Sequence, residues 1–350
     1  MLRIIVSEPP FEKPKRRVRY PGRNPRRFAE KYKELAPDRY RDDVARVIAA
    51  GKTPAGMHRP IMVREILELL DPKPGQLAVD CTLGYGGHAE ALLRSIQPGG
   101  RLIGLDTDPI ELEKTEERLR ALGFGPDSFT AHHKNFAGIA SIVAEPADIV
   151  LADLGLSSMQ MDNPERGFTF KSDGPLDLRM NPRRGEPASA MLATITPSRL
   201  SQLLADNSDE PDADRIAAAI LKSPVATTTH LAEAVRRGGG DTDTVRRVFQ
   251  ALRIAVNDEF GVLEALLRNL PLCLKPGGRA AILTFHSGED RRVKKSFQAL
   301  LREGVYSAVA EDVIRPTPEE RRANPRSSSA KLRWAVLNGI RMSEKPGGKF

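Results

Sequence analysis

The stretch Ala78–His88, AVDCTLGYGGH, decides the fold of this chain. It opens with the apolar residues of a short strand that ends at Asp80, and it continues through Gly84, Gly86 and Gly87 into a helical pattern. Glycines at a strand-to-helix turn let the backbone approach a ligand, and the first turn of the helix offers free N–H groups. A tight turn without a ligand would use the same glycines. The neighbouring elements must decide between these two readings.

Strands and helices alternate around this stretch, which indicates an α/β fold with a doubly wound, mostly parallel sheet covered on both faces. Asp108 and Pro109 suit the cap and the first position of a helix. The expected strands are Gln76–Thr82, Arg101–Asp106, Ser128–His133, Ala147–Asp153 and Gly278–Phe285; the expected helices are Pro60–Leu70, His88–Ile96, one opening at Asp108-Pro109, and Val262–Leu270.

More than a hundred residues separate the strand that ends at Asp153 from the one that starts at Gly278, far more than a single crossover helix requires. They predict an inserted lobe at 163–257, which opens with a loop rich in Gly, Pro and Asp and continues as helical patterns. The expected division is an arm at 1–50, a core at 51–162 and 258–340, the inserted loop and helical lobe at 163–257, and a tail at 341–350.

Composition favours a reducing compartment. The two cysteines in 350 residues argue against a disulfide scaffold or a structural zinc site, and the short apolar run at the N-terminus does not suit a signal peptide. The net charge of +8 is concentrated in residues 1–50, which hold 14 Lys and Arg against 7 Asp and Glu. We therefore expect a cytoplasmic protein with a basic, extended arm that binds phosphates.

Three acids, Asp80, Asp106 and Asp153, end three of the expected parallel strands. Ligands of such sheets bind outside the carboxyl ends of the strands, so these side chains should converge on one cleft. Asp106 suits the ribose hydroxyls of an adenosine ligand. A carboxylate at Asp80 would repel a pyrophosphate but attract the ammonium and sulfonium groups of S-adenosylmethionine. The site therefore favours this methyl donor over a dinucleotide.

Five blocks in a fixed order resemble the bacterial family of ribosomal RNA small-subunit methyltransferase H, formerly called MraW, and the similarity covers about His58 to Ala335. The blocks are AVDCTLGYGGHAEALL from Ala78, DLGLSSMQMDNPERGFTFKSDGPLDLRMNP from Asp153, FQALRIAVNDE from Phe249, ILTFHSGEDRRVKKSF from Ile282, and NPRSSSAKLR from Asn324. The resemblance implies a class I, Rossmann-like methyltransferase that methylates N4 of a cytidine in the decoding region of 16S rRNA. Its methyl donor would be bound by residues matching Gly86, Gly87, His88, Asp106, Phe136, Asp153 and Gln160, in addition to Asp80 and Gly84 from the pattern above.

Catalytic and substrate residues are less clearly marked, because the signature of Asn or Asp followed by Pro-Pro and an aromatic is absent. Asp153, with the carbonyls and hydroxyls up to Ser157 and Ser158, is the expected set of acceptors for the amino hydrogens. A base taken out of its stack would need aromatic and polar neighbours. Phe168 is a candidate for stacking, although packing is the stronger reading, and His286 is a candidate for orienting the base, although backbone neighbours alone can satisfy a histidine. Further substrate candidates are Asp177, Arg179, Arg253, Asn257 and Arg291.

Two alternatives stay open: a related methyltransferase that acts on another RNA or on a protein, and a non-catalytic RNA-binding or ribosome-assembly factor with the same fold. The chain departs from the family pattern in three places. Gly288 stands where leucine is usual, the segment Ser208–Ile216 is acidic, and the arm before His58 is longer than the family needs.

We expect no metal. The partner would be 16S rRNA or the small ribosomal subunit, as free rRNA or as an assembled particle, with no membrane; the sequence leaves the oligomeric state open, a homodimer included.

Overall fold

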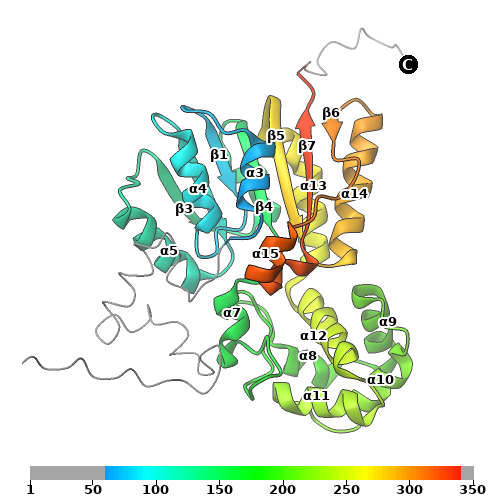
Figure 1. The fold of residues 1–350 in the computed structure, drawn as a ribbon. Helices are drawn as coiled ribbons and strands as arrows, with labels where there is room; N and C mark the ends of the chain where they lie inside the picture. The colour runs from blue at the N-terminus through cyan, green and yellow to red at the C-terminus, as the bar shows by residue number, and fades with distance from the viewer. Residues whose placement is uncertain (1–59, 340–350) are drawn as a thin grey trace, which may run out of the picture.

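The computed structural model describes residues 60–339, which form a seven-stranded sheet with helices on both faces and a helical lobe at one end (Figure 1). The strand order is β3-β2-β1-β4-β5-β7-β6. The first five strands are parallel, whereas β7 is antiparallel to both β5 and β6. Strand bounds are β1 Leu77–Asp80, β2 Arg101–Asp106, β3 Phe129–His133, β4 Ala147–Asp153, β5 Leu274–Thr284, β6 Tyr306–Val309 and β7 Lys331–Leu337.

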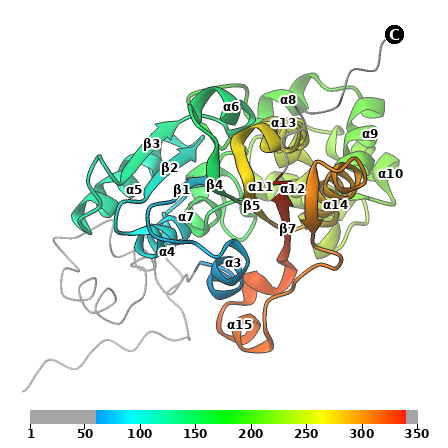
Figure 2. The ribbon, with the colours of Figure 1, turned by 90° about the horizontal axis from the view of Figure 1, so that it is seen from above.

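Two apolar clusters hold the helices on the sheet. Strand β1 shows how they are divided, because Leu77 and Val79 belong to one cluster and Ala78 to the other. Figure 2 shows α3, α4 and α5 on one side of the sheet and α6 and α13 on the other. Helix bounds are α3 Val63–Leu70, α4 Gly87–Ile96, α5 Pro109–Ala121, α6 Ile139–Ile142, α13 Glu259–Cys273 and α14 Ser287–Arg302. The result is a three-layer core with the sheet in the middle.

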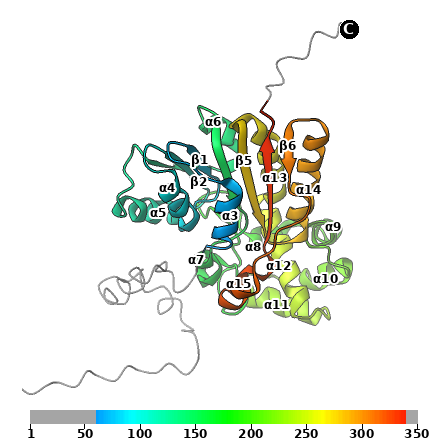
Figure 3. The same cartoon turned by 45° about the horizontal axis from the view of Figure 1, so that its top comes forward.

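The lobe has its own apolar core, made by residues between Phe168 and Leu252. It lies beyond the carboxyl ends of the parallel strands, below the sheet in Figure 1. Its helices, with the short α7 that leads into it, are α7 Ser158–Asp162, α8 Ala188–Thr194, α9 Pro197–Ser208, α10 Ala213–Ile220, α11 Thr228–Arg237 and α12 Thr242–Asn257. The last helix, α15 (Pro318–Ala323), lies near α7 at the boundary between sheet and lobe (Figure 3). An ion pair of 2.7 Å between Arg326 and Asp162 closes this boundary.

The chain leaves β1 toward β2 and β3 on one side, and it returns to β4 and β5 on the other. The order therefore reverses between β1 and β4. Such a switch point leaves a crevice at the carboxyl ends of the strands, because the connections on its two sides run in opposite directions. In this protein the lobe faces that crevice.

The α/β class and the expected strands are confirmed, with β2 and β4 at the predicted residues. Asp108 caps α5 by accepting a hydrogen bond from the N–H of Ile110, as predicted. The antiparallel end made by β6 and β7 was not predicted, nor were α14 and α15. The predicted arm at 1–50 and tail at 341–350 lie outside the described residues. Within the part that the structure describes, no helix combines the length and the apolar character needed to cross a membrane.

Candidate functional site

A cavity of about 1060 Å³ opens at the switch point, between the carboxyl ends of the strands and the lobe. Eight of the nine expected methyl-donor residues line it: Gly84, Gly86, Gly87, His88, Asp106, Phe136, Asp153 and Gln160. The ninth, Asp80, lies just behind this wall and is 1% exposed. The structure therefore brings together residues that the chain spreads over 81 positions, from Asp80 to Gln160.

The glycine-rich turn after β1 is locked against α5. Gly86 has φ of 78°, and a Cβ there would lie 2.6 Å from Cγ2 of Thr115, so a larger residue would both strain the backbone and collide with α5. Arg118 of α5 donates to the carbonyl of Tyr85 from Nε and Nη2, and its guanidinium lies 4.6 Å from the centre of the Tyr85 ring. The turn is thus held open toward the cavity before any ligand arrives.

Asp106 ends β2 at the far side of the cavity. Its two oxygens accept hydrogen bonds from the backbone N–H groups of Gly84, at 2.7 Å, and Asp108, at 2.8 Å. Each carboxylate oxygen keeps a further lone pair, so the side chain can still accept from two ribose hydroxyls. Burial raises the pKa of Asp106 to about 7, although these two hydrogen bonds lower it.

Asp80 and Asp153, at the ends of β1 and β4, are joined through Thr82. Oδ1 of Asp80 accepts from the N–H of Thr82, and the Thr82 hydroxyl accepts from the N–H of Asp153 at 2.6 Å. Burial raises the pKa of Asp80 to about 6, even though the neighbouring His88 lowers it. The two acids therefore form one buried negative region at the switch point.

His88, at the start of α4, faces this region. Its Nε2 lies 3.3 Å from Oδ2 of Asp153. Burial would lower the pKa of His88, but the contact with Asp153 and the charge of Asp80 outweigh it and raise the pKa. His88 thus lies against Oδ2 of Asp153, whereas Oδ1 is buried.

Three carboxylate oxygens that accept no hydrogen bond within the described part of the chain show whether a cationic nucleoside fits the cavity. Oδ2 of Asp80 and Oδ1 of Asp153 are buried and accept no hydrogen bond from any residue between 60 and 339, and the same is true of Oε2 of Glu111, whose side chain also lines the cavity. Buried acceptors without donors are costly, so they suit a ligand that brings N–H groups or positive charge. Together with the pair of ribose acceptors on Asp106, these groups fit S-adenosylmethionine.

Gln160 reaches this site from α7, a short helix that it helps to cap. Ser157 accepts from the N–H of Gln160, and Oε1 of Gln160 accepts in turn from the N–H of Ser157. Nε2 of Gln160 donates to Oδ2 of Asp108, which also accepts from Arg166. Ser157 and Ser158, the other expected catalytic residues, both line the cavity.

The expected substrate residues divide into two groups. Phe168, Arg253, Asn257 and His286 line the cavity, whereas Asp177, Arg179 and Arg291 are not among its lining residues. Phe168 is 5% exposed and belongs to the core of the lobe, so packing accounts for most of its surface.

The polar members of this list are held by other residues of the chain. Arg179 pairs with Asp177 at 2.8 Å, and Arg253 donates from two nitrogens to Glu259. Asn257 accepts from the N–H of Met180 and donates to the carbonyl of Leu178, a residue with φ of 65°. Asn257 therefore fixes a strained turn of the lobe loop.

The acidic segment after α9 folds onto arginines of the same chain. Glu210 is 3% exposed and accepts from Arg247 at 2.6 Å. Asp209, with φ of 53°, accepts from Arg291 of α14 at 3.0 Å. The acidic residues of this segment are thus paired inside the molecule, where Asp209 joins the lobe to the core.

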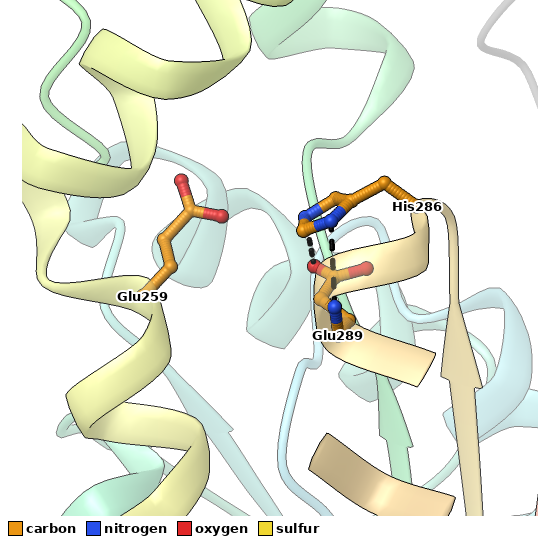
Figure 4. A group of neighbouring side chains, drawn as sticks. All are labelled: Glu259, His286 and Glu289. Carbon is orange, nitrogen blue, oxygen red and sulfur yellow. Dashed lines mark hydrogen bonds and ion pairs between the residues drawn. The ribbon is translucent and has the colours of Figure 1, made fainter. Parts of the chain in front are cut away.

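Figure 4 shows a group that the sequence analysis did not single out as a whole: Glu259 extends from α13 toward His286 and Glu289 at the start of α14. Nδ1 of His286 accepts from the N–H of Glu289, and Oε2 of Glu289 accepts from the N–H of Phe285. The signal for Glu289 was its position three residues after a helix cap, where acids are favoured.

A metal ion at this group would compete with existing partners. The three candidate ligand atoms lie within 4.8 Å of one another, but both oxygens of Glu259 are bound by Arg253. A cation there would displace a largely buried guanidinium from its carboxylate, which is costly. The group is therefore better described as the Arg253–Glu259 ion pair beside His286 and the Glu289 carboxylate.

Comparison with known proteins agrees with this geometry. The chain is 52% identical over 342 residues to "Ribosomal RNA small subunit methyltransferase H 2" of Alkaliphilus metalliredigens, which covers 93% of this chain and 98% of the relative. It is 51% identical over 339 residues to "Ribosomal RNA small subunit methyltransferase H 1" of Lachnoclostridium phytofermentans, covering 92% and 93%. A third relative, "Ribosomal RNA small subunit methyltransferase H" of Myxococcus xanthus, is 40% identical over 299 residues, covering 79% and 96%.

The two longer alignments extend into the arm. Residues 60–350 are 291 of 350 positions, or 83% of the chain, so a coverage of 92–93% must include part of residues 1–59. These two relatives therefore share part of the arm, whereas 79% of this chain suffices to cover 96% of the Myxococcus xanthus relative. The profile of the MraW methylase family matches residues 55–337, which include every site residue described above. The chain belongs to the MraW methylase family.

Proposed function

We propose that this chain transfers a methyl group from S-adenosylmethionine to N4 of a cytidine in the decoding region of 16S rRNA, in the cytoplasm. The observation that carries the proposal is the row of strand-end acids Asp106, Asp80 and Asp153, two of which keep a buried oxygen without a hydrogen-bond donor. The relatives of this chain are named for methylating small-subunit ribosomal RNA. Family membership and an intact pocket together favour this reaction over a non-catalytic role.

When bound, S-adenosylmethionine supplies a methyl group on a positively charged sulfur. Asp106 would accept from its ribose hydroxyls, with Phe136 beside the adenine, and Asp80 would balance its positive charge. Gly84, where a Cβ would meet only the carbonyl oxygen of Thr82 at 3.8 Å, would leave room for the nucleoside against the backbone. These residues would hold the methyl donor in one orientation, and such positioning of the reacting groups supplies rate enhancement.

Asp153 would hold the amino group of the target. The Asp153 side chain is 26% exposed at the cavity wall, and its carboxylate would accept an N4 hydrogen and turn the nitrogen lone pair toward the methyl carbon. The bound donor would supply its methyl group to N4, and N4 would then lose one hydrogen as a proton. Ser157 and Ser158, which line the same cavity, would supply further acceptors for the amino hydrogens with the carbonyls that precede them. His88 is a positioning residue in this account.

Residues 163–257 would form the recognition lobe, and 51–162 with 258–340 the catalytic core. A target base must leave its stack to reach the cavity. Lys171 and Arg246 are exposed residues of the lobe at the cavity wall, so they are placed to meet phosphates of the flipped strand. The basic arm would add contacts that do not depend on sequence.

Methyl transfer to isolated small subunits and to free 16S rRNA tests the proposal directly. Both substrates are taken from a strain that lacks this activity, and the product is mapped by nuclease digestion and mass spectrometry. Methylation at N4 of one decoding-region cytidine is expected. Transfer to a different RNA or to a protein favours the related-methyltransferase alternative, and donor binding without transfer to any substrate favours an assembly factor.

A further inference from the structure

The wall of the cavity beyond Asp153 carries a histidine whose protonation is set by its neighbours. His286 caps α14, and its Nδ1 accepts from the backbone N–H of Glu289 at 3.4 Å. A ring nitrogen that accepts a hydrogen bond carries no proton, so the neutral ring carries its proton on Nε2. His286 therefore offers one donor, Nε2–H.

This donor lacks an aligned acceptor. Nε2 is buried and makes no hydrogen bond with residues 60–339; Oε1 of Glu289 lies 3.2 Å away but off the line of the N–H bond. Burial would raise the pKa of Glu289, but His286 and the charge of Arg253 outweigh it and lower the pKa, so the carboxylate stays ionised and polarises the ring. A polarised, buried donor in the wall of a binding cavity suits an acceptor atom of the substrate.

The ring is held in place before any substrate binds. Phe260 packs on it with ring centres 5.8 Å apart, and the guanidinium of Arg292 lies 3.5 Å from the centre of the Phe260 ring. A Cβ on Gly288 would lie 2.7 Å from Phe260 and 3.2 Å from Nδ1 of His286. The glycine that departs from the family pattern is thus the residue that admits Phe260 against the histidine. Figure 4 shows the ring pointing toward Glu259, which Arg253 holds from the other side.

The sheet sets where this donor lies relative to the reacting nitrogen. Strands β4 and β5 are neighbours, with Asp153 opposite Leu283, and the N–H of Leu154 donates to the carbonyl of Leu283 at 2.9 Å. His286 follows three residues later. Adjacent strands are about 4.8 Å apart, so the ends of β2, β1, β4 and β5 form a row. Along it come the ribose acid Asp106, then Asp153, then His286.

We propose that Nε2–H of His286 donates to N3 of the target cytosine and makes the site select cytosine over uracil. This inference rests on the proposed N4 methylation. In cytosine, N3 is an unprotonated acceptor beside N4, so a base with its amino group at Asp153 presents N3 to the next strand end. In uracil, N3 carries a hydrogen, so its N3–H would face the Nε2–H of His286 and neither donor would have an acceptor. Glu289 is a positioning residue for His286.

Small subunits reconstituted with 16S rRNA that carries 3-deazacytidine at the target position test the contact, because this analogue replaces N3 with C–H. The full-length wild-type chain and His286→Asn are compared by kcat/KM. Asparagine keeps the helix cap but is too short to present the Nε2 donor. For the wild type, the analogue should lower kcat/KM at least about tenfold. For His286→Asn, the rate on cytidine should already be lowered by a similar factor, and the analogue should cost little more.

Ser287→Ala is the matched control, because it changes the next residue, whose hydroxyl contacts Asp209 and not the cavity group. It should keep the full effect of the analogue. Equal losses with the analogue in wild type and His286→Asn would overturn the inference, as would a wild type that does not distinguish the two bases. A wild type that leaves cytidine unmethylated overturns the proposed function as well, so the two failures are distinguishable. An unchanged affinity of His286→Asn for S-adenosylmethionine would show that the methyl-donor site of the variant is intact.

Discussion

The carboxylate of Asp108 and the guanidinium of Arg166 form an ion pair of 2.7 Å between side chains that are 0% and 9% exposed. The same oxygen of Asp108 accepts from Gln160, and Arg166 also donates to the carbonyl of Met180. Asp108 follows the ribose acid by two residues, whereas Arg166 opens the lobe loop. The pair therefore joins the methyl-donor site to the lobe through buried charge.

Arg166→Ala should lower the free energy of unfolding by about 3–5 kcal/mol, because it leaves the Asp108 carboxylate buried without its partner. Urea unfolding measures the loss. The double variant Asp108→Asn, Arg166→Gln removes both charges and should be more stable than Arg166→Ala alone. Arg237→Ala, which breaks an exposed pair with Glu233, is the control and should cost at most about 1 kcal/mol. If Arg166→Ala also lowered the free energy of unfolding by at most about 1 kcal/mol, the stabilising role of this pair would be contradicted.

Affinity for S-adenosylmethionine should rise as the pH rises through 6 to 7. In the free protein burial raises the pKa of Asp80 to about 6 and of Asp106 to about 7, and the cationic ligand prefers both acids ionised. Calorimetric titrations from pH 5.5 to 8 measure this dependence. Asp106→Asn should weaken binding and flatten the profile, and a wild-type profile that is flat over this range would contradict the assignment.

The same two acids should make the free protein less stable as the pH rises. Their pKa values in the folded state lie above the ordinary value of 3.8, so between about pH 4 and 7 the folded state binds more protons than the unfolded state. The contribution of these groups to stability is therefore largest at the acid end and is lost as the pH approaches 7. Thermal unfolding with saturating S-adenosylmethionine should show a shallower decline than unfolding without it.

Asp153→Asn should lower kcat about a hundredfold or more while S-adenosylmethionine still binds, because an amide cannot accept and neutralise the amino hydrogens as the carboxylate does. Single-turnover methyl transfer at saturating S-adenosylmethionine separates this step from binding. Ser141→Ala, at an exposed position of α6, serves as the control and should leave the rate unchanged. Equal losses of kcat and of donor affinity in Asp153→Asn would place the residue in donor binding alone.

Asp209→Asn should release Arg291 and strengthen binding to rRNA. The pair is exposed on both sides, so its loss should change the free energy of unfolding by at most about 1 kcal/mol. A freed arginine can meet a phosphate, which would steepen the salt dependence of binding by about one unit of slope. Filter binding at several salt concentrations measures this change. Adding Arg291→Ala should abolish the gain; a gain that persists would show that Arg291 is not the contact.

Deletion of residues 1–50 should flatten the salt dependence of rRNA binding and leave S-adenosylmethionine affinity intact. If about six of its basic residues meet phosphates, the full chain loses about a thousandfold in affinity between low and moderate salt, and the truncated chain loses far less. Parallel titrations of both chains check this. An unchanged slope would reject the role of the arm.

The agreement between sequence and structure is greatest where function depends on backbone geometry. The strand-end acids, the glycine turn and the cap at Asp108 occupy the predicted places, because each is specified by neighbours within a few residues. The antiparallel strands β6 and β7 were missed because β6 is short, and because β7 pairs with β5 across a stretch of chain that includes α14 and β6, a pairing that no local pattern marks.

By itself the sequence determined the α/β class, the family and the row of acids that receives a cationic nucleoside, since these follow from local backbone requirements and from order along the chain. Only the tertiary structure decided what the polar side chains do. It gave Arg253 and Arg291 partners on other elements of the chain, and it brought Glu259 and Glu289 to His286. The physical reason is that the partner of a charged side chain depends on which elements pack together, and packing joins residues that no local pattern connects.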